Sequence, residues 1–501
     1  MEVMKKQNLL LVLMLVFLPY ASMFAFDFEV DGVCYNKLSD SEVEVTDKSD
    51  GYTGEVFIPS TISYNDVIYS VIGIGSKAFA NSSARIRSGK DHKPNSVTIS
   101  EGIKYIAGNA FVRCSKMLSI SFPTSLTSIG NYAFQNCSGL LSISILGSSV
   151  SINEHAFKDC SALKSIYIPN SRESFSGNVF EGCDSVEYVN LNCEVIEPCF
   201  RGLKSLKEVV LGDNVKTISD GAFDGCSALT SVPLNRNVMS IGNSAFSGCY
   251  KLESISLSEN LINIGDYAFS GCSQLTTVII PNSVTHIGQG AFYGCVKLSS
   301  AILSQNITAI KDYTFSNCSL NSVTIPEKVD SIGDYAFRGC DFASVIVPNN
   351  VTYLGKSVFS GCTNLSSVSI SPNITEINDY TFSGCALTSV TIPKGVISIG
   401  YGAFYGCSNL NSIIIPESVQ KIEGDAFSNT PWYENQPDGL IYLGLIAYKY
   451  KGSMPENTSL EIKDGTLGIA GSAFSNYDNL VSITIPESVI NIGPYAFYYC
   501  I

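Results

Sequence analysis

A unit of 22 or 23 residues recurs along most of the chain, and this repeat limits how the chain can fold more than any other feature does. The segment 252–273 reads LESISLSENLINIGDYAFSGCS, and the unit 275–295 repeats its apolar positions, its glycines, its Phe and its Cys. The repeat phenylalanines are Phe79, Phe111, Phe134, Phe157, Phe180, Phe200, Phe223, Phe246, Phe269, Phe292, Phe315, Phe337, Phe359, Phe382, Phe404, Phe427, Phe474 and Phe497. A period of about 20–29 residues is typical of a leucine-rich solenoid, in which each coil buries its apolar face against its neighbours.

Each unit is expected to form one coil with two short extended segments. In Leu387–Pro393, Val390 and Ile392 share the inner face because strand side chains alternate, while Thr391 points outward. A second extended segment follows at Val396–Gly400. We therefore expect a β-dominated α/β leucine-rich-repeat solenoid with a parallel sheet along one side, and with a second short strand and one helical turn in every 22–23-residue coil.

The expected helical turn is illustrated by Gly333–Cys340, where Asp334 occupies an N-cap position and Gly339 a C-cap position. The equivalent aspartates in other coils are Asp266, Asp312 and Asp379. Such a row could form a calcium ladder or could accept hydrogen bonds from free backbone N–H groups. Capping is favoured, because each coil supplies one carboxylate with no second ligand beside it.

The chain divides into five expected parts. Residues 1–25 have Lys5 and Lys6 before the apolar run Leu9–Leu18, which is typical of a secretory signal peptide and short for a membrane span. Residues 26–78 are expected to form an N-terminal cap with hairpins, since Asp31-Gly32 is a hairpin signal. The repeats occupy residues 79–427. An irregular coil with a hairpin insertion occupies residues 428–463, and the final repeats occupy residues 464–501. The stop at Cys500-Ile501, where a strand should begin, suggests truncation.

The charge balance and the histidines argue against two classes of function. There are 31 Lys and Arg residues against 45 Asp and Glu, a net charge of −14, which argues against nucleic acid as a partner. His92, His155 and His286 lie in separate coils, and no carboxylates cluster in one groove, so an enzyme is not expected and no cofactor is implied. One basic cluster, between Arg85 and Lys93, is either a solvated loop or a site for an anionic glycan.

Seventeen cysteines raise the question of disulfides in an exported protein. Fourteen of them follow the repeat phenylalanine by three residues, and Leu203 takes this position in one coil. A cysteine that forms a disulfide could not be replaced by leucine in this way. We therefore expect a stacked row of buried, unpaired thiols. Metal binding is less favoured, because ligand spacing of the CxxC kind is absent. Whether Cys193 and Cys199 pair stays open.

The unit L-x-S-I-x-I-P-x-S-V-x-x-I-G-x-x-A-F-x-G-C-S resembles the BspA-like class of leucine-rich repeats, as at Ile399-Gly400, Ala403-Phe404 and Gly406-Cys407. The resemblance covers about 97–500. It implies a secreted or cell-surface protein without catalytic residues. Since the apolar run is short, no transmembrane segment is expected in the mature chain. Members of this family are implicated in adhesion to host matrix proteins, host cells and other microbes, so a protein or glycan ligand on such a surface is the implied partner.

The candidate contact surface is the outward position between the two inward residues of the first strand. It is filled by Ile279, Ile302, Thr324, Ile346 and Ile414, with Ser369 and Thr391 in the intervening coils. β-Branched residues there could simply favour a strand, or they could form a partly apolar contact strip. Trp432, Tyr433, Tyr442 and Tyr448 are candidate aromatic anchors. The alternatives to a binding protein are a spacer that displays a missing C-terminal module and, less favoured, a glycan-active enzyme.

Overall fold

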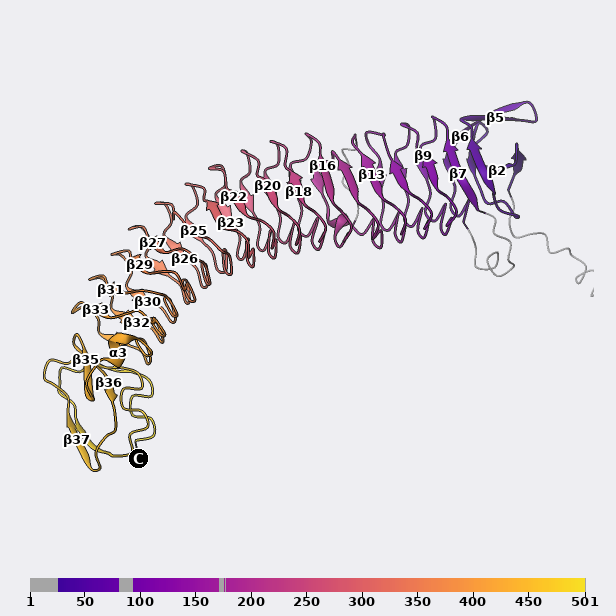
Figure 1. Ribbon diagram of the computed structural model, residues 1–501. Coiled ribbons are helices and arrows are strands. Elements are labelled where there is room, and N and C mark those ends of the chain that lie inside the picture. The colour runs from indigo at the N-terminus through magenta and orange to yellow at the C-terminus, as the bar shows by residue number, and fades with distance from the viewer. Residues whose placement is uncertain (1–25, 81–92, 171–174, 176, 501) are drawn as a thin grey trace, which may run out of the picture. The chain divides into compact units, whose positions relative to one another are not determined.

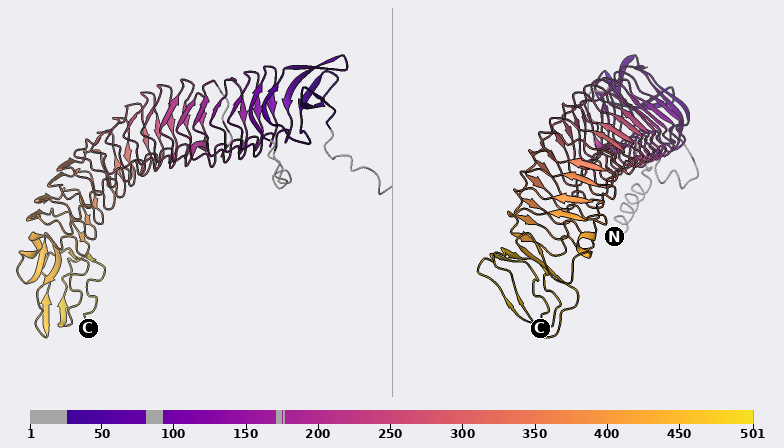
Figure 2. Two further views of the ribbon diagram at one scale, coloured as in Figure 1. Left: turned by 45° about the vertical axis from the view of Figure 1, so that its right-hand side comes forward. Right: turned by 60° about the vertical axis from the view of Figure 1, so that its left-hand side comes forward.

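The computed structural model describes residues 26–80, 93–170, 175 and 177–500 (Figure 1). The expected signal peptide, residues 1–25, and most of the basic cluster, including Arg85, Arg87 and Lys90, lie outside the described residues. The chain forms two compact units, and each is a stack of coils (Figures 1 and 2). Unit 1 comprises Met1–Leu163 and Phe175–Cys183, and unit 2 comprises Lys164–Ser174 and Asp184–Ile501.

Unit 1 has two rows of strands. The first row is the parallel sheet β4 (Gly54–Ile58), β7 (Pro94–Ile99) and β9 (Ser119–Ser121), and β11 (Ser142–Ser144) follows in the next coil. The second row pairs in the order β1 (Phe28–Val30), β2 (Val33–Lys37), β3 (Glu42–Val45), β6 (Val67–Ile74), β8 (Tyr105–Ile106), β10 (Ser128–Ile129) and β12 (Ser151–Ile152), with β5 (Thr61–Tyr64) paired to β6. The hairpin predicted at Asp31-Gly32 is confirmed, because β1 and β2 pair antiparallel across these two residues.

Unit 2 also has two rows of strands. Its first-row strands are β13 (Ser165–Ile168), β14 (Tyr188–Leu191), β16 (Glu208–Leu211), β18 (Ser231–Pro233) and β20 (Ser254–Ser256), then the pairs β22 (Thr277–Ile279) with β24 (Ser300–Ile302), β27 (Ser344–Ile346) with β29 (Ser367–Ser369), β31 (Ser389–Thr391) with β33 (Ser412–Ile414), and β37 (Thr458–Glu461) with β39 (Leu480–Thr484). The second row holds β15 (Val195–Ile196), β17 (Thr217–Ile218), β19 (Ser240–Ile241), β21 (Asn263–Ile264), β23 (His286–Ile287), β25 (Ala309–Ile310), β26 (Ser331–Ile332), β28 (Tyr353–Leu354), β30 (Glu376–Ile377), β32 (Ser398–Ile399), β34 (Lys421–Ile422), β38 (Gly468–Ile469) and β40 (Asn491–Ile492).

These strands confirm the predicted parallel solenoid and its alternation of faces. Within each unit, successive coils pair parallel and in register, as Ile279 with Ile302 shows. Val390 is buried and Thr391 is exposed, as the period of two residues predicts. In the described residues of the two units, helix is limited to the short turns η1 (Pro198–Phe200) and α3 (Pro431–Glu434).

The segment that follows the second strand differs from the expected helical turn. Tyr335 has φ 58° and Gly339 has φ 71°, so the backbone enters the left-handed region at two positions, one on either side of Phe337. The same two positions are left-handed at Tyr267 and Gly271. A right-handed helix cannot continue through such residues, and the segment is a run of turns instead.

Hydrogen bonding explains this turn geometry. The N–H groups of Tyr335, Phe337 and Gly339 donate to carbonyls of the next coil at 2.8, 3.0 and 2.9 Å. The N–H groups between them, those of Arg338 and its equivalents, donate within the turn. Because every second N–H is used between coils, the backbone satisfies its polar groups without forming a helix.

The aspartate row accepts backbone hydrogen bonds, as predicted, but the bonds bridge neighbouring coils. Oδ1 of Asp312 accepts from the N–H of Asp334 at 2.8 Å, and Oδ1 of Asp334 accepts from the N–H of Lys356 at 2.7 Å. Asn243 makes the same bond to the N–H of Asp266 at 2.8 Å. Across the described residues, no group of three or more His, Cys, Asp and Glu side chains is arranged to hold a metal ion.

The repeat phenylalanines form a column of stacked rings in each unit, which confirms the predicted register. From Phe200 to Phe427, neighbouring ring centroids lie 5.1–5.8 Å apart with planes within 14° of parallel. In unit 1 the column extends from Phe79 to Phe180. These rings are buried, so each one is a large part of the apolar contact between its coil and the next.

All seventeen cysteines are unpaired, which confirms the predicted row of thiols and answers the question of Cys193 and Cys199. In the regular coils the thiol donates to the carbonyl oxygen of the phenylalanine one coil earlier, as Cys295 does to Phe269 at 3.1 Å. Burial raises the pKa of the Cys362 thiol to about 12. A thiol thus fits as a small apolar side chain that also supplies a weak donor.

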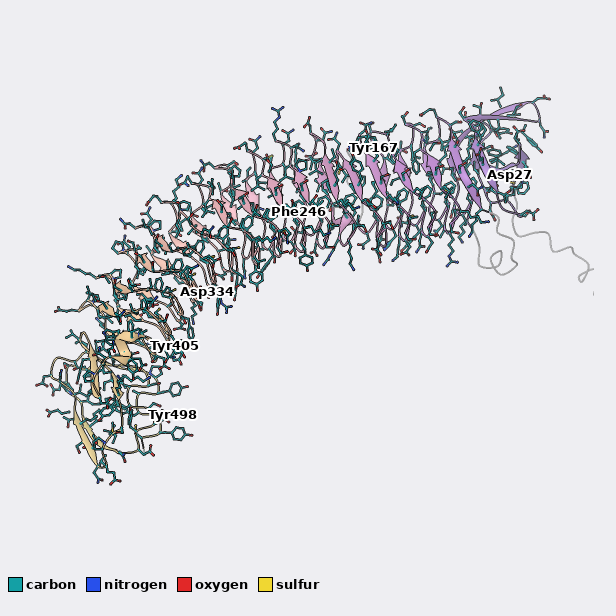
Figure 3. All side chains as sticks on the ribbon, in the orientation of Figure 1. Asp27, Tyr167, Phe246, Asp334, Tyr405 and Tyr498 are labelled. Atoms are coloured by element: carbon teal, nitrogen blue, oxygen red, sulfur yellow. The ribbon has the colours of Figure 1, made fainter. Side chains whose placement is uncertain are left out.

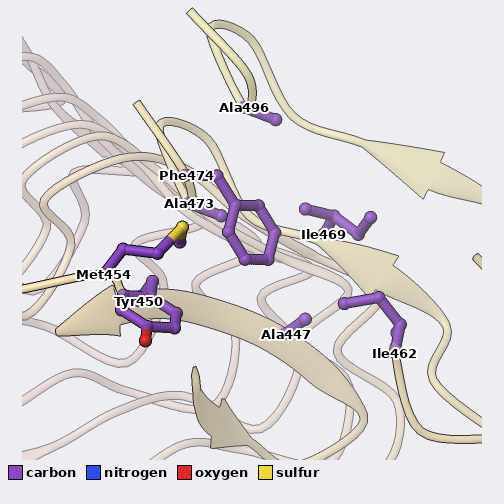
Figure 4. Packing of buried hydrophobic residues seen from close by; sticks show 8 residues of the cluster. All are labelled: Ala447, Tyr450, Met454, Ile462, Ile469, Ala473, Phe474 and Ala496. Carbon is purple, nitrogen blue, oxygen red and sulfur yellow. The ribbon is translucent and has the colours of Figure 1, made fainter. Parts of the chain in front are cut away.

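The irregular coil contains the predicted hairpin, formed by β35 (Gly439–Leu443) and β36 (Ile446–Lys451). Strand β36 also pairs parallel with β38, so it takes the place of a second-row strand. A cluster of buried residues includes two residues of β36 and packs against this hairpin (Figure 4). Its members are Ala447, Tyr450, Met454, Ile462, Ile469, Ala473, Phe474 and Ala496.

Replacing Phe292 by Ala should lower the free energy of unfolding by about 3–5 kcal/mol, because the ring leaves a cavity between two coils. Denaturant unfolding monitored by circular dichroism measures this change. Tyr293→Ala, on the adjacent and partly exposed side chain, is the matched control and should cost much less. A loss below about 1 kcal/mol for Phe292→Ala would contradict the role of the column.

Replacing Asp334 by Ala should lower the free energy of unfolding by about 0.5–2 kcal/mol, since the N–H of Lys356 loses its acceptor. Asp334→Asn should be nearly neutral, because the amide oxygen of Asn243 makes the same bond. Thermal and denaturant unfolding of both variants distinguish the effects. Equal losses of stability in the two variants, or stabilisation of the parent protein by calcium, would indicate that the negative charge of Asp334 matters instead.

Thiol titration of the unfolded, unreduced chain should find all 17 cysteines free. In the folded protein only Cys500, which is partly exposed, should react quickly with a thiol reagent. Buried thiols such as Cys362 and Cys407 should react slowly at pH 8, because the thiolate is the reacting form and burial raises the pKa of both to about 12. Fewer than about fifteen free thiols after unfolding would contradict the unpaired row.

Candidate functional site

The strand-face strip, which we define as Ile279, Ile302, Thr324, Ile346 and Ile414, lies at the outward positions of the first strands in unit 2. The four isoleucines are 65%, 57%, 72% and 59% exposed, and Thr324 is also exposed. Isoleucine is among the residues most often buried in proteins, so four such side chains on one face are informative. The structure therefore places the predicted residues on one open surface.

Backbone pairing holds these side chains in position. Ile279 and Ile302 are direct neighbours in register, and the N–H of Ile280 donates to the carbonyl of Ile302 at 2.9 Å. Ile346 is paired with Ser369, and Ile414 with Thr391. Thr324 lies in a coil where no strand is assigned, so it interrupts the sheet between β24 and β27. The strip is thus a row with one irregular step.

The outward strand positions around the strip carry no charged side chain. The outward first-strand positions between β22 and β33 are Thr277, Ile279, Ser300, Ile302, Ser322, Thr324, Ser344, Ile346, Ser367, Ser369, Ser389, Thr391, Ser412 and Ile414, and all are exposed. The chain as a whole carries 45 acidic and 31 basic residues. A face of this length that holds only hydroxyl and aliphatic side chains suits a ligand that is itself uncharged where it makes contact.

The candidate aromatic anchors have different environments. Trp432 packs against Phe427 with ring centroids 5.9 Å apart, so it covers the end of the phenylalanine column. Tyr448 is 1% exposed, and its hydroxyl accepts a hydrogen bond from the N–H of Phe427 at 2.9 Å. Tyr448 is therefore part of the core and is unavailable to a ligand, which corrects the expectation for this residue.

Tyr433 and Tyr442 remain at the surface, where both are half-buried. Lys449 and Lys451 place their ammonium groups 5.9 and 5.7 Å from the centre of the Tyr433 ring. Lys463 lies 4.4 Å from the centre of the Tyr442 ring. These cation–π contacts fix the rings and surround them with positive charge, in contrast to the uncharged strip.

A second group of exposed side chains, which sequence reasoning missed, lies on the turns. It consists of the partly exposed tyrosines Tyr267, Tyr293, Tyr380, Tyr401 and Tyr405; Figure 3 labels Tyr405. Gly290 and Gly402 lie beneath the rings of Tyr267 and Tyr380, where any larger residue would collide with the ring. Two recurring sequences were the signal that could have revealed most of this group: Asp-Tyr before Ala-Phe or Thr-Phe, at Tyr267 and Tyr380, and Phe-Tyr-Gly-Cys, at Tyr293 and Tyr405.

One turn tyrosine connects the repeats to the irregular coil. The hydroxyl of Tyr401 donates to Asp425 at 3.1 Å, and Lys449 contacts the other carboxylate oxygen at 2.8 Å. Burial and the neighbouring Asp425 raise the pKa of Tyr401 to about 12. Lys449 and the other groups that donate hydrogen bonds to the Asp425 carboxylate lower the pKa of Asp425. Partial burial of the carboxylate opposes this effect. These contacts are structural, since they join two coils.

In the described part of the chain, none of the helices has the length and apolar character that a membrane crossing requires.

Comparison with known proteins places the repeat in a family. The profile of the BspA type leucine rich repeat region matches residues 90–198, 194–320, 285–397, 331–453 and 445–501. These segments together extend without a gap from residue 90 to residue 501. A search of the curated proteins finds no significant match.

Several solved structures are similar to this chain. A leucine-rich repeat protein from Bacteroides ovatus is 22% identical, with 95% of this chain and 93% of that chain covered and a TM-score of 0.36. A leucine-rich cell surface protein from Faecalibacterium prausnitzii is 25% identical, with 82% and 93% covered and a TM-score of 0.35. The pneumococcal vaccine antigen PcpA is 16% identical, with 93% and 98% covered and a TM-score of 0.33.

The repeat unit, the parallel pairing of successive coils and the match over residues 90–501 agree with one another. The chain belongs to the BspA-type leucine-rich repeat family.

Proposed function

We propose that this chain is an exported, non-catalytic binding protein of the adhesin type. The strand-face strip contacts a protein or glycan ligand on a host or microbial surface. The observation that carries the proposal is the row of exposed isoleucines on an uncharged face. Exposed apolar side chains rimmed by polar ones mark contact surfaces in soluble proteins.

The composition of this face supports contact rather than catalysis. A reaction needs converging acids, bases or nucleophiles, and the face from β22 to β33 offers hydroxyl groups and aliphatic side chains only. Strands in a sheet repeat at about 4.8 Å, so the strip presents similar groups at regular intervals. Such a surface suits an extended or repetitive ligand.

Two features support export and a surface location. The start of the chain, with Lys5, Lys6 and the apolar run Leu9–Leu18, has the pattern of a signal peptide. BspA-type repeats are typical of surface proteins, which agrees with a secreted or cell-surface location. Tyr433 and Tyr442 supply a smaller, positively charged contact beyond the strip.

Replacing Ile279, Ile302 and Ile346 together by Ser should weaken ligand binding at least tenfold, which corresponds to about 1.4 kcal/mol. The three changes remove most of the apolar area of the strip without touching buried residues. The mature chain is first screened against immobilised matrix proteins, mucins and glycans. The dissociation constants of parent and variant are then measured by surface plasmon resonance.

The matched control replaces Ile262, Ile397 and Met239 by Ser. These side chains are 45%, 46% and 43% exposed, but they precede the second strands and lie outside the strip. The control should keep the parent affinity. If the strip variant folds and keeps the parent affinity, the strip is not the binding site. If the mature chain binds nothing in the screen, the spacer alternative is favoured.

A further inference from the structure

Strand β4 is the end strand of the first-row sheet in unit 1. The order of this sheet is β4, β7 and β9, and β7 is the only strand among the described residues that pairs with β4. The carbonyl of Ile58 accepts from the N–H of Ser100 at 3.0 Å, so Ile58 faces β7. Backbone polar groups alternate along a strand, so those of Glu55 and Phe57 point to the free edge.

The free edge of β4 borders a cavity of about 690 Å³, a volume within the usual range of ligand sites. Glu55, Val56 and Phe57 form one wall, and the β1–β2 turn and β5 form others. Figure 1 shows β5 at the end of the stack of coils in unit 1. The cavity, which is partly open to solvent, therefore lies beside unpaired backbone groups.

Buried tyrosines line the inner side of the cavity, and one of them is held by two hydrogen bonds. Tyr52 lines it and is buried, and its hydroxyl donates to the carbonyl of Thr46 at 2.7 Å and accepts from the N–H of Cys34 at 3.1 Å. Tyr35, which also lines it, is 1% exposed. A cavity whose inner side is held in this way is available to a ligand without rearrangement, which lowers the entropic cost of binding.

Apolar side chains are exposed beside this edge. Phe57 is 61% exposed, and Ile68 of the β5–β6 hairpin is 70% exposed. Ile68 is the pairing partner of Ser63, which lines the cavity. An edge strand with free backbone groups and exposed apolar side chains is a template for a further strand.

The charged groups that line the cavity favour a positively charged ligand. Asp31 and Glu55 line it, and Lys48 is the one cation among its lining residues. Lys48 pairs with Glu29, Nζ to Oε1 at 2.8 Å, and donates to the carbonyl of Gly32 at 3.0 Å. Carboxylates thus outnumber ammonium groups, and a ligand with a basic side chain complements them.

We propose that the free edge of β4 binds an extended polypeptide segment of a partner protein, which adds a strand beside Glu55 and Phe57 and carries a basic side chain toward Asp31 and Glu55. Backbone hydrogen bonds of the added strand supply affinity, and its alternate side chains supply specificity. This site is separate from the strand-face strip, so it gives the protein a second mode of contact.

The probe is a fluorescent, end-blocked peptide of about seven residues in which valine and lysine alternate, long enough to form a strand. Its dissociation constant with the mature chain is measured by fluorescence anisotropy. We expect saturable binding, and at least tenfold weaker binding both for a peptide with glutamate in place of lysine and for one with alternate backbone nitrogens methylated. Equal binding of the three peptides would overturn the proposal, and so would an absence of saturable binding.

Two protein variants locate the site. Phe57→Pro removes the N–H that faces the free edge, and Glu55→Lys reverses a charge in the cavity; each should weaken binding at least tenfold. Asp40→Lys makes the same charge change on an exposed residue of unit 1 outside the cavity lining, and should change binding less than twofold. Circular dichroism checks folding, and Glu55→Lys decides the result if Phe57→Pro does not fold.

Unchanged binding in Glu55→Lys, or an equal loss in Asp40→Lys, would contradict the site. A second copy of the chain is the other possible occupant of a free sheet edge. Sedimentation analysis tests for it: a dimer of the parent protein that Phe57→Pro abolishes would overturn the proposal of a partner segment.

Discussion

Hydrogen bonding between successive coils is the interaction on which the rest of this structure depends. Each coil is hydrogen-bonded to the next in the first strand, in the second strand and at three alternate N–H groups of the turn. Backbone polar groups that are buried must be paired, so a coil is not stable without its neighbour. The stacked phenylalanines, the thiol bonds and the aspartate bridges all follow from this spacing, because identical side chains meet in adjacent coils.

Most of this fold was predictable from the sequence, because the repeat period places equivalent residues above one another. The phenylalanine column, the thiol row and the outward position of Ile279 all follow from it. The Ile-Gly pair also has a physical cause: a Cβ at Gly288 would collide with the backbone of Asp266 in the preceding coil. The recurrent glycine thus permits the close approach of neighbouring coils.

The turn could not be derived in the same way. The spacing of small and aromatic residues around Phe337 is also that of a helical turn, and a non-glycine residue such as Tyr335 rarely adopts a left-handed conformation. Intercoil hydrogen bonds stabilise that conformation, and they become visible only when two coils are compared in space. Tyr448 shows a related limit, since it lies in the irregular coil, where no period indicates which side chains face inward. The free edge of β4 depends on sheet order, which a repeat pattern does not contain.

The direction of the intercoil hydrogen bonds has a mechanical consequence. Because these bonds run from coil to coil, a force that separates the two ends of a stack loads them one interface at a time. A coil that detaches releases 22 or 23 residues, and a fully extended segment of that size is about 75 Å long. A protein that attaches one surface to another through such a stack can lengthen stepwise under shear. The remaining coils keep their hydrogen bonds to one another while it does so.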